Sequence, residues 1–309
     1  WGLFKKMVIA DRANIFVSEV FGDYQKYSGS IILLGGVLYT LQIYAEFSGC
    51  MDIVTGSAEL FGVPLSQNFS RPFFSKSVAE FWRRWHITLG AWLRDYVFYS
   101  VSLSKPFMKL SRFAKEHLNE FLGSLIPASF AMFFTWFGIG FWHGAGVKYI
   151  IYGLYYYAVM MLGMYLEPLF ARAFNAAHIN RNSKPLNALR ILRTLILVVC
   201  GMTLFRAETV GIWLGMIKRV FTGFGGGTFL NDALLCGMDK QDFLIVILGA
   251  AVMLVISTLQ EKGINVRDTL AKQVLPVRWT VYICLVLSVI IFGAYGIGYD
   301  AVDFIYGQF

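Results

Sequence analysis

Long apolar runs alternate with short polar segments along the 309 residues of this chain. An α-helix needs roughly 20 apolar residues to cross the hydrocarbon core of a bilayer. By this measure we expect membrane spans over 31–47, 121–142, 147–166, 190–205, 243–260 and 278–298. Residues 3–21 mix charged and apolar side chains, which predicts an amphipathic helix near the membrane interface.

The segment 77–101 follows neither pattern, because it is too charged to span and too aromatic to be a free loop. An interfacial or re-entrant helix accounts for both properties. On one continuous helix, Arg83, His86 and Arg94 would share a side, and Trp82 would lie on an adjacent side. The pattern as a whole predicts an all-α, polytopic transmembrane helix bundle with interfacial or re-entrant helices.

Composition agrees with a membrane protein, since 57% of the residues are hydrophobic and 15% are charged. The net charge of +8 is concentrated in the segments 105–117, 168–190 and 261–278, which we expect to face the cytoplasm. No separate basic domain remains for nucleic acid. The four cysteines lack zinc-site spacing, so no metal is expected. No linker divides the chain, and we expect a single domain over 1–309.

His143 lies at the end of an apolar run, among the four glycines of 138–146. Small residues allow another helix or an acyl chain to approach closely. A buried imidazole stays neutral and can take a proton from an attacking hydroxyl group. The alternative is a structural histidine that is hydrogen-bonded between helices.

His86 lies in a stretch of arginine and tryptophan residues. Arginines beside a histidine suit an anionic group such as a phosphate or a sugar acid. Arg83, Arg84 and Arg94 are therefore candidates for binding a donor's phosphates or for stabilising an oxyanion. The alternative is simple anchoring at the interface, where arginine and tryptophan are both common.

Three acidic residues, Glu46, Asp52 and Glu59, follow the first span. We expect them to pair across helices with the arginines of 77–101, in a structural role. The chain contains no GxSxG, GxxxxGK or HExxH motif, so the hydrolase, nucleotide-binding and zinc-protease classes find no support.

Several motifs together resemble one family. They are Gly2–Lys6, Tyr44–Gly49 with Asp52, Asn68–Phe73, Glu80–Ile87, Trp92–Tyr96 and Phe141–Ala145. With them the chain resembles the membrane-bound O-acyltransferases, within the bacterial branch of alginate O-acetyltransferases and D-alanyl-lipoteichoic acid transferases. Residues 304–309 are similar to the alginate type, whereas 99–104 depart from its Pro-Leu-Gly-Gly-like turn.

The resemblance implies a helix bundle around a central channel that holds His143 as the catalytic residue and His86 as a second histidine. We assign Trp82 and Trp142 to substrate binding with the arginines. The implied reaction moves an acyl group from a cytoplasmic thioester donor, acetyl-CoA or an acyl carrier protein, to an extracytoplasmic polysaccharide. We favour acetyl transfer, with D-alanyl transfer to teichoic acid as the alternative.

The resemblance also implies a multi-pass location in the bacterial cytoplasmic membrane, among membrane lipid, and further spans before Trp1. The expected partner outside the membrane is the polysaccharide or an accessory transferase protein, and no tightly bound cofactor is expected. Two other functions remain open. A histidine-dependent transporter would move a solute without changing the acyl content of the wall, and a non-catalytic scaffold would tolerate loss of His143.

Overall fold

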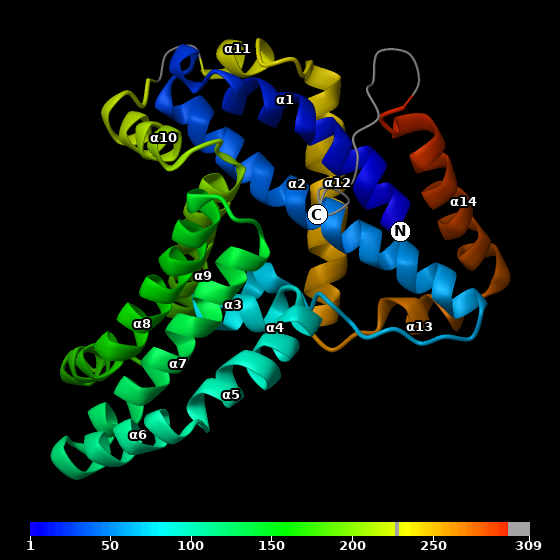
Figure 1. The fold of residues 1–309 in the computed structure, drawn as a ribbon. Coiled ribbons are helices and arrows are strands. Elements are labelled where there is room, and N and C mark those ends of the chain that lie inside the picture. The colour runs from blue at the N-terminus through cyan, green and yellow to red at the C-terminus, as the bar shows by residue number, and fades with distance from the viewer. Residues whose placement is uncertain (226–228, 296–309) are drawn as a thin grey trace. The chain divides into compact units, whose positions relative to one another are not determined.

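The structure is a computed structural model that describes residues 1–225 and 229–295. Within these ranges the chain is helical, with one isolated antiparallel bridge between Phe69 and Trp85 and no strand (Figure 1). The helices gather into two compact units. We call residues 67–210 the central unit, and residues 1–66 with the described residues from 211 onward the terminal unit.

The terminal unit contains both ends of the described chain. Its elements are the π-helical η1 (Phe4–Ala10), α1 (Asp11–Gly22), the 3-10 turn η2 (Tyr24–Lys26), α2 (Gly29–Leu60), α10 (Val210–Thr222), α11 (Phe229–Leu234), α12 (Lys240–Glu261), α13 (Val266–Ala271) and α14 (Leu275–Phe292).

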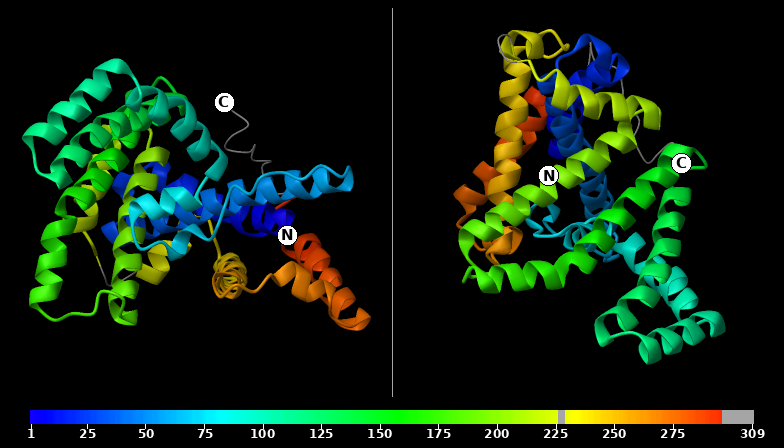
Figure 2. Two further views of the ribbon diagram at one scale, coloured as in Figure 1. Left: turned by 90° about the horizontal axis from the view of Figure 1, so that it is seen from below. Right: turned by 90° about the vertical axis from the view of Figure 1, so that its left-hand side faces the viewer.

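The central unit contains both histidines of interest. Its elements are the 3-10 turn η3 (Pro72–Phe74), α3 (Val78–Arg84), α4 (Ile87–Leu93), the π-helical η4 (Arg94–Phe98), α5 (Tyr99–Ser102), α6 (Lys105–His117), α7 (Glu120–Trp142), α8 (Val147–Ala176) and α9 (Lys184–Arg206). Helices α7 and α8 lie side by side in each view (Figure 2).

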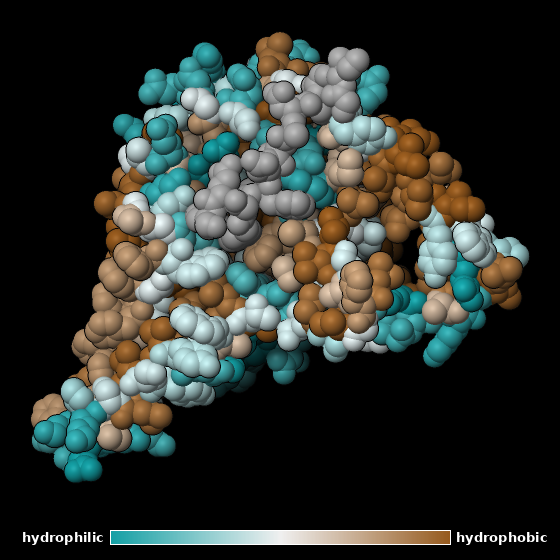
Figure 3. All heavy atoms as spheres, turned by 45° about the vertical axis from the view of Figure 1, so that its right-hand side comes forward, coloured by the Kyte–Doolittle hydropathy of each residue, from teal (hydrophilic) through white to brown (hydrophobic). Residues whose placement is uncertain are grey.

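Six helices, α2, α7, α8, α9, α12 and α14, are long and apolar enough to cross a membrane. Five of the predicted runs lie wholly within these helices, and the sixth, 278–298, is helical as far as Phe292, which together confirm the polytopic all-α fold. The run predicted at 190–205 is the end of a longer helix that begins at Lys184. The predicted end at 298 lies outside the described residues, as does the motif at 304–309. Apolar side chains cover much of the surface in Figure 3, as expected where lipid replaces water.

The prediction that residues 3–21 form an amphipathic helix with its charged side chains exposed at the membrane interface is wrong for three of these side chains. Lys5, Lys6 and Arg12 are buried, as are the apolar Ile9 and Phe16. The charged side chains are enclosed because this segment packs on α2, so it belongs to the core of the terminal unit.

Close helix packing explains the enclosure of the lysines. A Cβ atom at Gly2 would lie 2.4 Å from the carbonyl oxygen of Gly49 on α2, so the two segments touch backbone to backbone. Lys5 then reaches Asp52 at 2.7 Å, and Lys6 contacts Glu46 at 3.1 Å.

The three acidic residues, which the sequence predicted to pair with arginines of 77–101, have cationic partners within the terminal unit. Glu46 and Asp52 take lysines of the N-terminal segment, and Glu59 accepts two hydrogen bonds from Arg267 of α13, at 2.9 and 2.8 Å. The lysines are adjacent in sequence to apolar residues, and the sequence pattern alone did not place them against α2.

Candidate active site

The hairpin of α7 and α8 is built on glycines. A Cβ atom at Gly140 would lie 2.5 Å from the carbonyl oxygen of Tyr149, and one at Gly153 would lie 2.2 Å from that of Trp136. The two helices can approach this closely only where a side chain is missing. The expectation that the glycines around His143 admit a neighbouring helix is confirmed at Gly140.

His143 follows the last residue of α7 and is 5% exposed. Aromatic rings surround its imidazole. The ring centroids lie 5.1 Å away for Phe205, 5.7 Å for Tyr152 and 6.5 Å for Tyr149. These residues come from α8 and α9, so these two helices, together with the end of α7, enclose the imidazole in a largely apolar environment.

Trp82 fixes α3 to the same hairpin. Its ring lies 4.8 Å from that of Tyr156 and 5.3 Å from that of Trp136, both edge to face. Such aromatic pairs contribute about 0.5–1.5 kcal/mol each beyond the area they bury. Trp82 is thus part of the packing that holds α3 on α7 and α8, and its predicted contact with substrate stays a prediction.

The helix predicted through 77–101 is interrupted at Trp85 and His86, which corrects the expectation of one continuous element. Trp85 has extended backbone and pairs with Phe69, through a hydrogen bond from Ser70 N to Arg84 O of 2.9 Å. His86 has left-handed backbone at φ 47°, and α4 begins after it. Arg83, His86 and Arg94 consequently do not share one helix face.

Asn68 holds the imidazole of His86. Its Oδ1 atom lies 3.0 Å from His86 Nδ1, 2.7 Å from Thr88 Oγ1 and 3.4 Å from the backbone nitrogen of Thr88. Because a backbone N–H can only donate, the amide presents its oxygen, and His86 Nδ1 must carry the proton that it donates. The other ring nitrogen, Nε2, is then the basic one.

Trp142 joins the two histidines. Its ring lies 6.0 Å from that of His86 and 4.9 Å from that of His143. Burial lowers the pKa of His86 to about 4. Burial, with the charge of His86 as the second cause, lowers the pKa of His143 to about 3. Both imidazoles are therefore neutral near pH 7, and each can accept a proton.

The three candidate arginines are placed differently from one another. Arg83 is exposed. Arg84 donates to Glu80 at 2.7 Å and to the carbonyl oxygen of Arg71 at 3.3 Å, so it supports the loop before α3. Arg94 is exposed and pairs with its neighbour Asp95 at 2.9 Å. Their predicted role in binding substrate remains a prediction.

Sequence reasoning missed four residues around the histidines, namely Asn68, Tyr149, Tyr152 and Phe205. The sequence points to Asn68 only as part of a family motif. The spacing of Tyr149 and Tyr152 places them on one side of a helix, which is a usable signal. Nothing in the pattern around Phe205 distinguishes it from other apolar positions of its span.

The chain is similar to known proteins that transfer acyl groups. Residues 21–201 match the family model described as MBOAT, membrane-bound O-acyltransferase family. A probable alginate O-acetylase, AlgI, of Pseudomonas aeruginosa is 34% identical over 249 residues, which cover 80% of this chain and 42% of that protein.

Two other relatives carry different names. A peptidoglycan O-acetyltransferase of Helicobacter pylori is 29% identical over 243 residues, covering 78% of this chain and 40% of its own length. A teichoic acid D-alanyltransferase of Bacillus subtilis is 30% identical over 146 residues, covering 47% and 33%. The chain thus spans less than half the length of each of these curated relatives.

Proposed function

Because the chain belongs to the membrane-bound O-acyltransferase family, we propose that it transfers an acetyl group from a cytoplasmic thioester donor to hydroxyl groups of a cell-surface polysaccharide. The observation that carries this proposal is the contact of the Trp142 ring with both His86 and His143, of which His143 is enclosed by aromatic rings. Two of the relatives are named for O-acetylation, which favours acetyl as the group transferred.

In the proposed reaction His143 is the general base. The acceptor oxygen attacks the thioester carbonyl carbon while His143 takes its proton, and that proton then passes to the sulfur as the carbon–sulfur bond breaks. General-base catalysis contributes roughly 10²–10⁴-fold to such a rate. His86 presents its basic Nε2 for positioning the donor or for sharing the proton transfer, because Asn68 engages its other nitrogen.

Several further assignments belong to the same proposal. Arg83, Arg84 and Arg94 bind phosphates of the donor, which is acetyl-CoA or an acyl carrier protein, and Trp82 and Trp142 line its path. No tightly bound cofactor takes part. The protein is a multi-pass membrane protein, and we place it in the bacterial cytoplasmic membrane, where its partner outside is the polysaccharide itself or an accessory transferase protein.

A second candidate is D-alanyl transfer to teichoic acid. It is supported by the match to the Bacillus subtilis teichoic acid D-alanyltransferase, which covers 47% of this chain. The same base and the same proton path serve both reactions, because both form an ester from a thioester and a hydroxyl group. The donor's acyl group is therefore the distinguishing feature.

The test is the ester-linked acyl content of the cell surface, released by mild base, in cells with the intact protein and with His143→Ala. We expect released acetate that disappears in the variant while the protein level is unchanged. D-alanine that disappears instead would select the second candidate. Unchanged release of both would refute His143 as the base.

A further inference from the structure

Two cavities of the central unit have volumes of about 440 and 480 Å³. The larger of these two lies where α8 ends and α9 begins. This α8–α9 cavity has a volume of about 480 Å³. Its polar lining is Lys76, Ser77, Glu167, Arg181, Arg190 and Arg193. Four cationic side chains thus face one carboxylate, which gives the cavity a strong positive potential.

Hydrogen bonds hold these cations in place. Arg190 donates to the carbonyl oxygen of Arg181 at 3.1 Å, and Arg193 donates to that of Lys76 at 3.0 Å. Arg181 forms an ion pair with Glu167. Each guanidinium group has five N–H donors, so these contacts leave several donors for an anion.

The remaining lining is apolar and consists of Phe170, Phe174, Leu186 and Leu189. Phe170 is 44% exposed and Leu189 is 61% exposed. Both lie on helices that are long and apolar enough to span a membrane. The cavity therefore combines a cationic wall with an apolar wall that continues onto a surface suited to lipid.

We propose that the α8–α9 cavity binds the phosphate headgroup of an acidic phospholipid, whose acyl chains lie along the apolar wall. Basic pockets between membrane helices are typical binding sites for such headgroups. A phosphate-bearing soluble molecule would be attracted by the same cations. The exposed apolar wall favours the lipid, because a soluble ligand would leave Phe170 and Leu189 uncovered.

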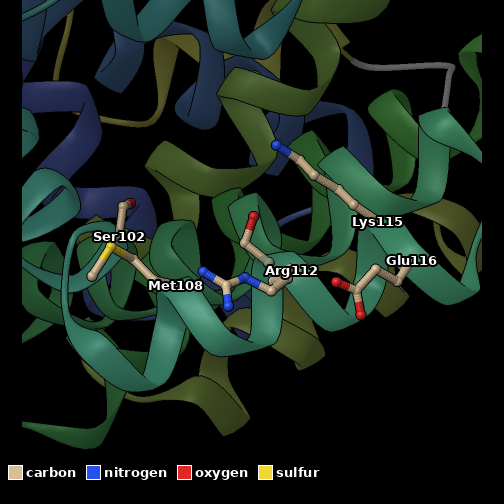
Figure 4. Close-up of a pocket in the computed structure, with 6 residues that line it drawn as sticks. Ser102, Met108, Arg112, Lys115 and Glu116 are labelled. Carbon is tan, nitrogen blue, oxygen red and sulfur yellow. The ribbon is translucent and has the colours of Figure 1, made fainter.

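The second cavity, on α6, supplies a comparison within the same unit. It has a volume of about 440 Å³ and is lined by Ser102, Met108, Ser111, Arg112, Lys115 and Glu116 (Figure 4). Two cations there face one carboxylate, and Met108 is the one large apolar residue of its lining. Removing Arg112 and Lys115 lowers the positive charge of the central unit without touching the α8–α9 cavity.

The experiment is a titration of the purified, delipidated protein, followed by native mass spectrometry. The probes are phosphatidylglycerol and phosphatidylcholine with the same acyl chains, and coenzyme A as a phosphate-bearing molecule without them. Loss of charge-assisted hydrogen bonds is expected to weaken phosphatidylglycerol binding about tenfold or more in Arg190→Gln/Arg193→Gln. The control Arg112→Gln/Lys115→Gln should bind as the unaltered protein does.

Two further variants separate binding from folding. Arg190→Lys/Arg193→Lys keeps the charge and should retain most of the affinity. Glu167→Gln removes the carboxylate that competes for Arg181, so it should strengthen phosphatidylglycerol binding, an effect that mere loss of structure would not produce.

Three results would overturn the proposal. They are equal binding of both lipids by the unaltered protein, equal loss of phosphatidylglycerol binding in the α6 control, and weaker binding by Glu167→Gln. Binding of coenzyme A that the arginine variants abolish, without any preference for phosphatidylglycerol, would reassign the cavity to a soluble phosphate compound. Because the readout is binding, failure here leaves the proposed acyl transfer untouched.

Discussion

Replacing Asn68 with alanine removes the acceptor that orients His86. Asn68 is 8% exposed, and its Oδ1 atom accepts from His86 Nδ1 at 3.0 Å and from Thr88 Oγ1 at 2.7 Å. Thr88 is exposed, so its hydroxyl group can turn to water. The half-buried imidazole of His86 has no such freedom, and we expect it to lose its fixed orientation and tautomer.

The structure sets the size of this effect. A buried donor that loses its acceptor costs about 1–3 kcal/mol. If the whole of that energy serves to order His86 for the reaction, acyl transfer falls roughly 5- to 150-fold, since each 1.36 kcal/mol is a factor of ten in rate. Thr88→Val leaves the contact between Asn68 and His86 in place, and it should change the rate little.

The assay is the initial rate at which cells incorporate labelled acetate into base-labile esters, at equal levels of each variant. Asn68→Asp supplies an independent readout. Its carboxylate keeps an acceptor near Nδ1 but favours the charged imidazole, so it raises the pKa of His86 above the value of about 4 in the unaltered protein. Activity that needs neutral His86 should then begin to fall at a higher pH.

Two results would refute the reasoning. Full activity in Asn68→Ala would show that the hydrogen bond does not position His86 for the reaction. An identical pH profile in Asn68→Asp and in the unaltered protein would show that the protonation state of His86 does not matter.

Three other predictions concern the packing and the charges. Lys6→Met removes a cation that contacts the buried carboxylate of Glu46, so the denaturation free energy in detergent should fall by about 3–5 kcal/mol, whereas Arg267→Met, at an exposed pair, should leave the midpoint nearly unchanged. Gly153→Val forces a side chain into α7 and should cost about 1–3 kcal/mol or more, while Gly163→Val, which faces open space, should cost far less; equal costs would contradict the close packing. Because burial and the nearby His86 lower the pKa of His143 to about 3, His143 stays neutral as the pH falls, and transfer in membrane vesicles should be constant between about pH 7.5 and 5.5; half-maximal activity near pH 6.5 would contradict the lowered pKa of this base.

The apolar runs were predictable because a membrane span depends on length and hydrophobicity, which a single sequence displays directly. Each of the six predicted spans corresponds to a helix of the structure, although the run predicted at 278–298 is helical only as far as Phe292. The two histidines were predictable as candidates for a related reason, since ionisable residues beside such runs are rarely without a role.

The burial of the two lysines in the N-terminal segment and the break between α3 and α4 could not be predicted from the sequence in this way. Lys5 and Lys6 looked like interfacial residues, and their burial depends on the contact of Gly2 with Gly49. The break after Arg84 has no proline or glycine to mark it, because it is produced by pairing with Phe69, a residue of another segment. Both features are tertiary, so the local pattern does not contain them.

Because His86 has a left-handed backbone and His143 does not, the effects of alanine substitution at the two histidines cannot be compared directly. His143 has φ −74° and ψ −10°, which most residues adopt freely, so His143→Ala reports mainly the loss of the imidazole. At φ 47° an alanine carries the conformational penalty of a side chain without the hydrogen bond to Asn68 that offsets it. Equal losses of activity at the two positions would therefore not mean equal roles in the chemistry, and glycine or asparagine is the more informative replacement at position 86.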